Sequence, residues 1–474
     1  MKQSPAEFRA AAVSGASAEP PQEALYTKHK KVYPRQVHGL FARLRTVGVL
    51  LLLGLYYGVA WLPWEGRQAL LFDLPNRKFY ILDWVFWPQD FFYLALLLII
   101  AALSLFFFTA LAGRLWCGYA CPQTVWTEVF LWMERRIEGG RAQQMKLDRR
   151  ALDARKLRFK ATKHAAWILF ALWTGFTFVG YFTPIRELWG AVWALELGPW
   201  QTFWILFYAL ATYGNAGWMR EQVCIYMCPY ARFQSALFDR DTLVISYDGR
   251  RGEPRGARSK AADLRAKGLG DCVDCTLCVQ VCPTGIDIRD GLQYQCIGCA
   301  ACVDVCDQVM AKMDYPKGLI RYTTENAMEG RPSRLLRPRV IVYGLLLILA
   351  MGGLAYALAL RVDMDIDIIR DRNALYRQAP AGQVENVYTL RVINMADETR
   401  TFRIGVEGLQ GLELINRHGA ITLPAGELTS IDVAVRIDPA HLPATSSEIR
   451  FALQTADGDR RLERTARFIG PALR

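Results

Sequence analysis

The sequence predicts a multi-domain membrane protein that combines a five-span α-helical bundle, a cysteine-rich insert and a C-terminal β-sandwich. Three observations support this fold class. Five apolar runs are each near the length that crosses the hydrocarbon core of a bilayer. Eight of the twelve cysteines fall between residues 272 and 306. Residues 361–474 alternate apolar and polar side chains with the period of β-strands.

The predicted spans are residues 46–62, 90–112, 165–183, 200–217 and 340–360. The Lys and Arg residues between them predict the orientation, because short loops rich in these residues stay in the cytoplasm. Residues 28–45 contain six and residues 113–164 contain twelve, whereas residues 63–89 contain three and residues 184–199 contain one. We therefore expect the first two segments in the cytoplasm and the last two outside.

No signal peptide is visible before the first apolar run, so the N-terminus is expected in the cytoplasm. With five spans, the end of the chain then lies on the opposite side of the membrane. The predicted parts are a cytoplasmic basic tail (1–45), transmembrane helices 1–4 (46–240), a cytoplasmic cysteine-rich domain (241–339), transmembrane helix 5 (340–360) and an outer domain (361–474).

The outer domain contains short apolar alternations separated by turn residues, at 388–392, 402–406, 431–437 and 449–453. Short strands at this spacing predict a small immunoglobulin-like β-sandwich. The domain contains no cysteine, and its histidines, His418 and His441, lie in polar stretches. We expect it to have a structural or docking role.

The insert contains two cysteine runs with the spacing C-x2-C-x2-C-x3-C. In proteins with two [4Fe–4S] clusters, three close cysteines bind one cubane and the fourth reaches the other cluster. The runs therefore predict a ferredoxin-like domain with two [4Fe–4S] clusters. The predicted ligands of cluster 1 are Cys272, Cys275, Cys278 and Cys306, and those of cluster 2 are Cys296, Cys299, Cys302 and Cys282.

A pair of zinc sites is the alternative interpretation of these eight cysteines. Structural zinc sites usually take their cysteines as two pairs rather than from such runs, so this alternative is disfavoured. The second run is followed by Asp307, where the first is followed by Pro283. This difference leaves the ligands intact.

Two C-x3-C-P motifs follow the second and fourth predicted spans. They contain Cys117 and Cys121, and Cys224 and Cys228. Cysteines four apart on a helix share one face, so two such pairs are expected to bring four thiols together at the membrane surface. Thiolates suit soft Cu(I), and Met227 adds a thioether. The alternative is that these cysteines are small apolar residues near helix ends.

Composition and missing motifs exclude several function classes. The net charge of +12 is concentrated beside apolar runs and comes with no recognition motif, so nucleic-acid binding is not expected. Only His164 lies close to a span, which argues against a transmembrane bis-histidine haem. No glycine-rich phosphate-binding fingerprint is present, so the reducing electrons must come from a partner or a small donor.

The sequence resembles the FixG/CcoG family of cytochrome c oxidase accessory proteins along nearly its whole length. The matching stretches are the eight-cysteine run and residues 32–39, 116–123, 175–187, 251–256, 315–322 and 370–377. This resemblance implies a place in the bacterial inner membrane, with an immunoglobulin-like C-terminal domain in the periplasm. It also implies a role in maturing a cbb3-type oxidase by reducing Cu(II) to Cu(I).

The sequence and the resemblance together suggest a membrane-bound cupric reductase. Copper is the expected substrate, and Cys117, Cys121, Cys224 and Cys228 are the candidate copper or redox thiols. The expected partners are membrane lipid, a copper importer or chaperone, oxidase assembly components and an unknown cytoplasmic electron donor. Two alternatives stay open: an electron-transfer subunit of a respiratory reductase pathway, and a non-catalytic assembly scaffold with structural clusters.

Overall fold

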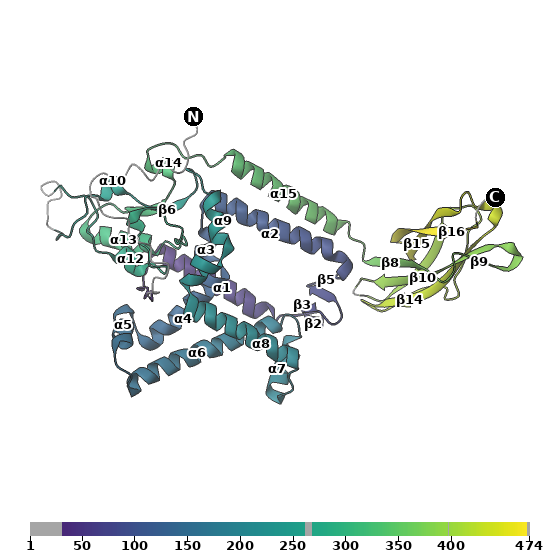
Figure 1. The fold of residues 1–474 in the computed structure, drawn as a ribbon, viewed down its shortest axis with the longest axis horizontal. Coiled ribbons are helices and arrows are strands. Elements are labelled where there is room, and N and C mark those ends of the chain that lie inside the picture. Colours follow the sequence, from purple (N-terminus) through teal and green to yellow (C-terminus); the bar gives the residue numbers. More distant parts are fainter. Residues whose placement is uncertain (1–30, 261–267, 397, 472–474) are drawn as a thin grey trace, which may run out of the picture.

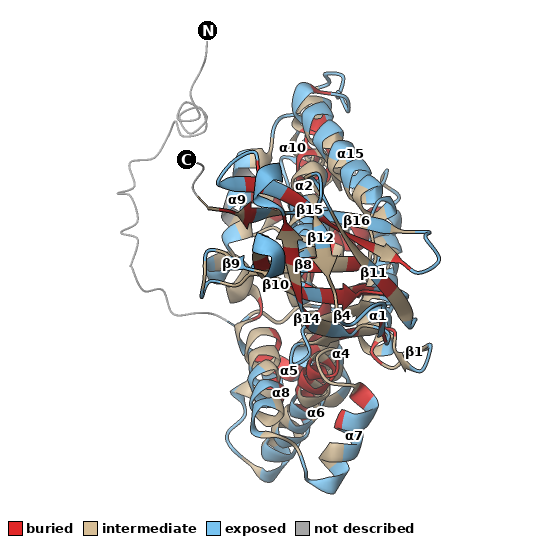
Figure 2. Ribbon diagram, turned by 90° about the vertical axis from the view of Figure 1, so that its right-hand side faces the viewer, coloured by how far each residue is buried: buried red, intermediate tan, exposed pale blue. Residues whose placement is uncertain are grey.

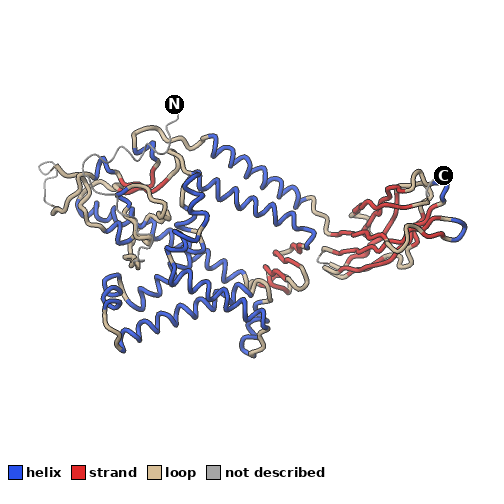
Figure 3. The backbone as a smooth tube through the Cα atoms, in the orientation of Figure 1, coloured by secondary structure: helices blue, strands red, loops and turns tan. Residues whose placement is uncertain are grey.

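The computed structural model describes residues 31–260, 268–396 and 398–471 (Figure 1). Helices form the middle of the molecule, the cysteine-rich insert lies at one end and a β-sandwich lies at the other (Figure 3). Residues 1–30, which make up most of the predicted basic tail, and residues 261–267 of the insert lie outside the described part.

Each predicted span corresponds to a helix. These helices are α1 (Leu40–Val59), α2 (Phe91–Ala112), α6 (Ala154–Val179), α8 (Pro199–Thr212) and α15 (Pro338–Ala359). Three stretches among the described residues are long and apolar enough to cross a membrane: Leu40–Val59, Pro88–Ala112 and Pro338–Ala359. On these stretches large apolar side chains such as Leu97 and Leu349 are more than half exposed, as expected for surfaces that meet lipid or protein.

The other two predicted spans differ from the expectation. Helix α6 begins at Ala154 rather than near residue 165, and its first turns are strongly basic. Helix α8 has only 14 residues and continues as a π-helix, η3 (Tyr213–Met219). Three of the five predicted spans therefore have the length and composition of a membrane span.

The middle region contains further helices, of which α4 is the longest with 17 residues. They are α3 (Leu115–Tyr119), α4 (Pro122–Glu138), α5 (Arg141–Arg149), α7 (Ile185–Ala194), the π-helix η4 (Val223–Met227) and α9 (Pro229–Leu237). Helix α4 packs against α6, and α2 packs against α15 (Figure 1). Tyr93 on α2 donates a hydrogen bond to the carbonyl of Ala357 on α15, at 3.1 Å.

The segment between α1 and α2 forms a small β-structure beside the sandwich. Its elements are β1 (Pro63–Trp64), β2 (Arg67–Gln68), β3 (Leu70–Asp73), β4 (Lys78–Ile81), β5 (Trp84–Phe86) and η2 (Pro88–Asp90). Val85 and Trp87 pack with Ile393 and Met395 of the sandwich in one apolar cluster. This segment and the C-terminal domain therefore share one end of the molecule.

The insert is built around one antiparallel pair of strands, β6 (Val244–Tyr247) and β7 (Ile320–Thr323). Its helices are α10 (Gly249–Gly252), α12 (Leu277–Val281), η5 (Ile288–Asp290), α13 (Ala301–Met313) and α14 (Glu325–Met328). Ile245, Ile288, Val303 and Ile320 form its core with Ala300 and Cys278. Both cysteine runs lie around this core.

The C-terminal domain is a sandwich of two antiparallel sheets. One sheet contains β8 (Met364–Arg370), β9 (Arg377–Gln378), β10 (Val384–Asn394), β12 (Glu413–Ile415) and β14 (Leu428–Ile437). The other contains β11 (Arg400–Glu407), β13 (Ile421–Leu423), β15 (Ser446–Thr455) and β16 (Arg461–Ile469). Short turns η6 (Pro380–Gly382) and η7 (Pro439–His441) complete it.

The four alternating stretches predicted from the sequence lie on β10, β11, β14 and β15. Their apolar positions face the space between the sheets, where Tyr388, Phe402 and Phe451 are fully buried (Figure 2). The two histidines lie outside these strands, and His441 ends η7.

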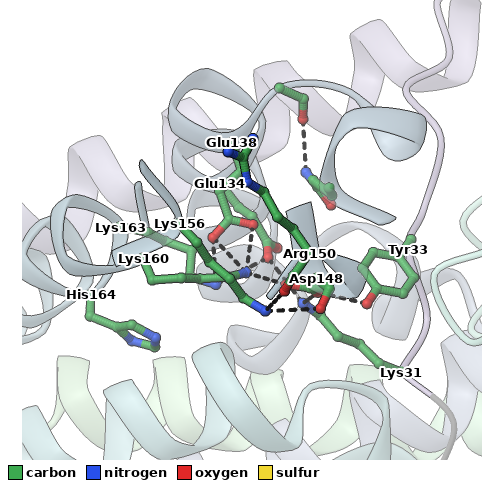
Figure 4. A network of polar contacts seen from close by, with 12 residues as sticks. Lys31, Tyr33, Glu134, Glu138, Asp148, Arg150, Lys156, Lys160, Lys163 and His164 are labelled. Atoms are coloured by element: carbon green, nitrogen blue, oxygen red, sulfur yellow. Dashed lines mark hydrogen bonds and ion pairs between the residues drawn. The ribbon is translucent and has the colours of Figure 1, made fainter. Parts of the chain in front are cut away.

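Buried ion pairs hold α4 against α6 (Figure 4). Glu134 and Glu138 on α4 have side chains that are 1% and 0% exposed. Lys163 on α6 lies 2.9 Å from Glu138, and Arg220 lies 2.7 Å from Glu134. The sequence pattern did not predict this network, because its carboxylates and cations are far apart along the chain.

A second part of the same network holds the N-terminal segment. Asp148 on α5 accepts a hydrogen bond from the hydroxyl of Tyr33 at 2.6 Å (Figure 4). Lys31 and Lys160 lie 2.9 and 2.5 Å from the same carboxylate. Residues 31–33 are thereby fixed beside α5 and α6.

Replacing Glu134 with Ala should destabilise the protein by about 3–5 kcal/mol, because Arg220 would stay buried without its carboxylate. The measurement is the unfolding midpoint of the detergent-purified protein. Glu325→Ala is the control, because the Arg240–Glu325 pair is exposed and its loss should cost at most about 1 kcal/mol. Equal shifts for the two variants would contradict the assigned role of Glu134.

Candidate iron–sulfur and thiol site

A small cavity in the insert gathers the four predicted ligands of cluster 1. Its walls include Cys272, Cys275 and Cys278 from the first cysteine run and Cys306 from α13. Apolar side chains such as Met310 and Leu319 complete the lining. The fourth thiol therefore comes from the second run, as the crossed spacing predicts.

A second cavity gathers the four predicted ligands of cluster 2. It is lined by Cys282 from the end of the first run and by Cys296, Cys299 and Cys302 from the second. Cys278 lines both cavities, so the two predicted cluster sites share a wall.

Left-handed residues bend both cysteine loops in the same way. Thr276 has φ 54° just before α12, and Ala300 has φ 57° just before α13. Each lies two residues before the third cysteine of its run, Cys278 or Cys302. The two loops are thus repeats in structure as well as in spacing.

The residues present fit two iron–sulfur clusters. A cubane takes one thiolate at each of four irons, so its ligands surround a cavity instead of converging on a single metal ion. Among the residues that the structure describes, no three His, Cys, Asp or Glu side chains are close enough to hold a single metal ion. The four thiols and the apolar lining at each cavity match the larger group.

Two buried arginines join the second cavity to the helical bundle. Arg114 donates to the carbonyl of Cys296 at 2.8 Å and to that of Ala231 at 3.1 Å. Arg45 on α1 donates to the carbonyl of Cys299 at 3.2 Å. In the described part of the chain, the Nε atoms of both arginines are buried without a hydrogen-bond partner. Two cations therefore lie beside ligands whose thiolates would give a bound cluster negative charge.

The loop of cluster 2 lies directly on the first C-x3-C-P motif. A Cβ atom added at Gly118 would lie 2.8 Å from the carbonyl oxygen of Gly298 and 3.0 Å from Cα of Cys299. Gly298 has φ 67°, which favours glycine, and its own Cβ would lie 3.0 Å from the carbonyl oxygen of Arg114. The contact is possible only because both positions are glycine.

The insert also caps α1. The carboxylate of Asp304 on α13 accepts hydrogen bonds from the backbone N–H groups of Phe41 and Ala42, at 3.2 and 2.7 Å. A carboxylate at a helix N-terminus satisfies free N–H groups and meets the positive end of the helix dipole. The roles of Asp304, Arg45 and Arg114 were not predicted from the sequence. Only Arg114, three residues before Cys117, had a signal in the sequence, because it begins the first motif.

The expectation that each cysteine pair shares one helical face is wrong. Cys117 lies in α3 and Cys121 is the N-cap of α4, while Cys224 lies in η4 and Cys228 is the N-cap of α9. The proline that follows each second cysteine starts a new helix, because proline is favoured in the first turn and breaks a helix interior. Each motif therefore spans a break between helices.

The two motifs nevertheless lie together. The amide of Gln123 donates to the carbonyls of Asn215 and Arg220, at 2.9 and 3.1 Å. The hydroxyl of Thr124 donates to the carbonyl of Cys117 at 2.5 Å. Residues just after Cys121 thus fix both the first motif and the segment that leads to Cys224.

All four thiols of these motifs are partly buried and influence one another. The pKa of Cys117 is raised to about 11, chiefly by burial and also by the thiols of Cys121 and Cys228, while the hydrogen bond from Gln234 lowers it. Burial raises the pKa of Cys224 to about 12, with the same two thiols contributing. The fully buried Gln234 donates its amide to the sulfur of Cys117 at 3.3 Å. The structure brings the four cysteines into one neighbourhood, and copper binding there stays a prediction.

Three family models match the chain. They are "4Fe-4S binding domain" over residues 94–139, "4Fe-4S dicluster domain" over residues 219–325 and "IG-like fold at C-terminal of FixG" over residues 354–471. The first includes Cys117 and Cys121, and the second includes the other ten cysteines. The iron–sulfur and immunoglobulin-like domains expected from the sequence are confirmed, while the assignment of individual ligands stays a prediction.

Two relatives match most of the chain, and one solved structure matches a smaller part. The nitrogen fixation protein FixG of Rhizobium meliloti is 38% identical over 422 residues, which cover 81% of this chain and 80% of that protein. Protein RdxA of Cereibacter sphaeroides is 41% identical over 406 residues, which cover 82% and 85%. A solved FixG-related protein from Vibrio parahaemolyticus is 30% identical and covers 23% of this chain and 97% of its own, with a TM-score of 0.21.

Anaerobically purified protein should contain about eight iron atoms and about eight acid-labile sulfides per chain, as two cubanes require. Cys282→Ser and Cys296→Ser should alter the electron paramagnetic resonance signal of the same cluster, although the two residues belong to different runs. Cys306→Ser is the matched comparison and should alter the other signal. Zinc without labile sulfide, or a different grouping of the variants, would overturn the assignment.

Proposed function

The chain belongs to the FixG family, and from that membership we propose that it is a membrane-bound electron-transfer protein that reduces Cu(II) to Cu(I) for the assembly of a cbb3-type oxidase. The iron–sulfur domains supply the capacity for electron transfer. Each [4Fe–4S] cluster, when bound, exchanges one electron at a time, which is the stoichiometry of copper reduction.

The observation that carries this proposal is the continuity from the insert to the thiol pairs. Cys275 at the first cavity is exposed, so a cytoplasmic donor can approach it. Cys278 joins the two cavities, and the loop of cluster 2 touches Gly118, the residue after Cys117. Electrons would cross only short, packed distances between the donor surface and the thiols.

The thiol pairs suit the proposed product. Thiolate sulfur is a soft ligand and favours Cu(I) over Cu(II), so binding at these four cysteines would assist the reduction. Gln234 and Thr124 hold Cys117 in place through its sulfur and its carbonyl. Copper would arrive from an importer or chaperone and leave toward oxidase assembly components.

The proposed place of the chain is the bacterial inner membrane, crossed five times. The N-terminal segment and the insert share one end of the bundle, and the sandwich shares the other with residues 63–90 (Figure 1). This arrangement supports the orientation expected from the Lys and Arg distribution. The insert would then be cytoplasmic and the sandwich periplasmic.

A reporter enzyme that is active only in the periplasm should be active when fused after Arg474 and inactive when inserted beside Lys260. The same reporter inserted between α7 and α8 should be active if α6 and α8 both cross the membrane. The physical reason is the excess of Lys and Arg on the segments assigned to the cytoplasm. An inactive reporter between α7 and α8 would mean that the chain has fewer than five spans. The reverse pattern of activity at the two other positions would mean that the topology is inverted.

Replacing Cys117 and Cys121, or Cys224 and Cys228, with Ser should slow the copper-driven reoxidation of the dithionite-reduced protein and weaken Cu(I) binding. Serine exchanges soft thiolates for hard hydroxyls that bind Cu(I) poorly. The change is followed by the return of cluster absorbance after copper is added anaerobically.

Tyr226→Phe is the control, because Tyr226 lies between Cys224 and Cys228 with 68% of its surface exposed. Iron and sulfide content should persist in all variants. If both double variants are reoxidised at the wild-type rate, copper is reduced at another part of the chain. If they lose iron, these cysteines bind a cluster.

A further inference from the structure

A cavity of about 870 Å³ lies between the bundle and the insert. Its walls come from residues 32–39, from α1 and α4, and from the loop of cluster 2. We call it the α1–α4 cavity. Its volume falls within the range of sites that bind small organic molecules.

One wall of the α1–α4 cavity is apolar and belongs to helix surfaces that are open to the outside. Val47 and Leu50 on α1 line it and are 60% and 67% exposed, and Trp132 on α4 is 53% exposed. Leu53 continues the same wall deeper along α1. Since α1 has the length and composition of a membrane span, this wall provides a path for a lipid-soluble tail.

Three arginines of the inner polar wall are ion-paired, and two exposed arginines, Arg35 and Arg43, also line the cavity. Arg45 and Arg135 lie 3.7 and 3.9 Å from the carboxylate of Glu128, and Arg220 is paired with Glu134. The hydroxyl of Thr127 adds a neutral hydrogen-bonding group. Cations already matched by carboxylates favour an uncharged polar head over an anionic one.

The redox groups of the site meet at this cavity. Cys299, a predicted ligand of cluster 2, and Cys224 of the second thiol pair both lie on its walls. A molecule bound there would touch a cluster ligand directly. The combination of an apolar tail path, a neutral polar head site and a cluster ligand matches a lipid-soluble quinol.

We propose that the α1–α4 cavity binds a quinol of the membrane, which donates electrons to the chain at Cys299. The quinol is oxidised to the quinone and loses two electrons and two protons. The two clusters, when bound, would take one electron each, and the two protons would pass to water beside His38, an exposed residue that lines the cavity. This inference rests on the proposed function and names its electron donor, beside any soluble donor that reaches Cys275.

The test uses the full-length protein with its clusters, in detergent, and a benzoquinone with a decyl tail. Binding is measured by isothermal titration calorimetry, and reduction by the matching quinol is followed anaerobically through the cluster absorbance. Leu53→Trp should weaken binding at least about tenfold and slow reduction by the quinol, because the larger side chain fills the cavity.

Leu51→Trp is the matched control, because Leu51 lies on the same helix, is 57% exposed and does not line the cavity. It should leave binding unchanged. Both variants should keep their iron content and their reduction by dithionite, which shows that the fold is intact. Equal quinone affinity in the two variants would overturn the proposal.

An anionic phospholipid is the competing occupant. Arg43→Gln tests it, because Arg43 is an exposed cation that lines the cavity. Quinone affinity should fall much less in this variant than in Leu53→Trp, because the neutral quinone has no charge that pairs with Arg43. Retained phospholipid that depends on Arg43, with no quinone binding, would overturn the quinol assignment. If quinol reduces the wild-type protein but copper does not reoxidise it, the cupric reductase function fails and the quinol site stands.

Discussion

The arrangement of the redox groups depends on one close contact, in which the cluster 2 loop rests on the turn that carries Cys117. Neither Gly118 nor Gly298 has room for a Cβ atom, so the two backbones approach more closely than any other residues would allow. Arg114 fixes the same contact from the side by bonding to the Cys296 carbonyl. The insert is thereby held on the bundle as one unit, and the distance between cluster ligands and thiols is set by backbone atoms rather than by flexible side chains.

Buried charges occur in the helical region and beside the insert, and they have different kinds of partner in the two places. In the helical region, Glu134 and Glu138 meet Lys163, Lys160 and Arg220, so each buried ion has a partner of opposite sign. Beside the insert, Arg114 bonds to carbonyl oxygens, and Arg45 bonds to a carbonyl oxygen and lies 3.7 Å from the carboxylate of Glu128. The Nε atoms of both arginines are buried without a hydrogen-bond partner in the described structure. Buried cations are costly unless paired. The negative charge of a cluster with thiolate ligands would stabilise these two arginines. Cluster binding would therefore favour docking of the insert on the bundle, and docking would favour cluster binding.

Local patterns predicted most of the fold and the grouping of the eight cysteines around two cavities. Apolar side chains alternate with polar ones around Tyr388 and Phe451, and this alternation predicted strands because each sheet buries only one of its faces. The cysteine runs predicted the two cavities because the spacing of ligands is a local property of the sequence. The pairing of Glu134 with Arg220 could not be predicted, because it depends on tertiary contact over many residues. The expectation that Cys117 and Cys121 share one helical face was wrong, because Pro122 starts a new helix. This proline was a local signal in the sequence, but the expectation rested on the spacing of the cysteines alone.

The helix breaks change what the thiol pairs can do. On one helix, two thiols would project from a side of the helix and meet only neighbouring side chains. At a break, the second cysteine of each pair becomes an N-cap, so free backbone N–H groups and the positive end of the helix dipole lie beside its sulfur. Burial raises the pKa of Cys121, but the N–H groups of Gln123 and Thr124 oppose that increase. Burial is the largest influence on the pKa of Cys117, and the amide of Gln234 rather than a backbone N–H opposes it. In the first motif, both pKa values are raised by burial, and only that of Cys121 is partly offset by the N–H groups of the helix that Pro122 begins.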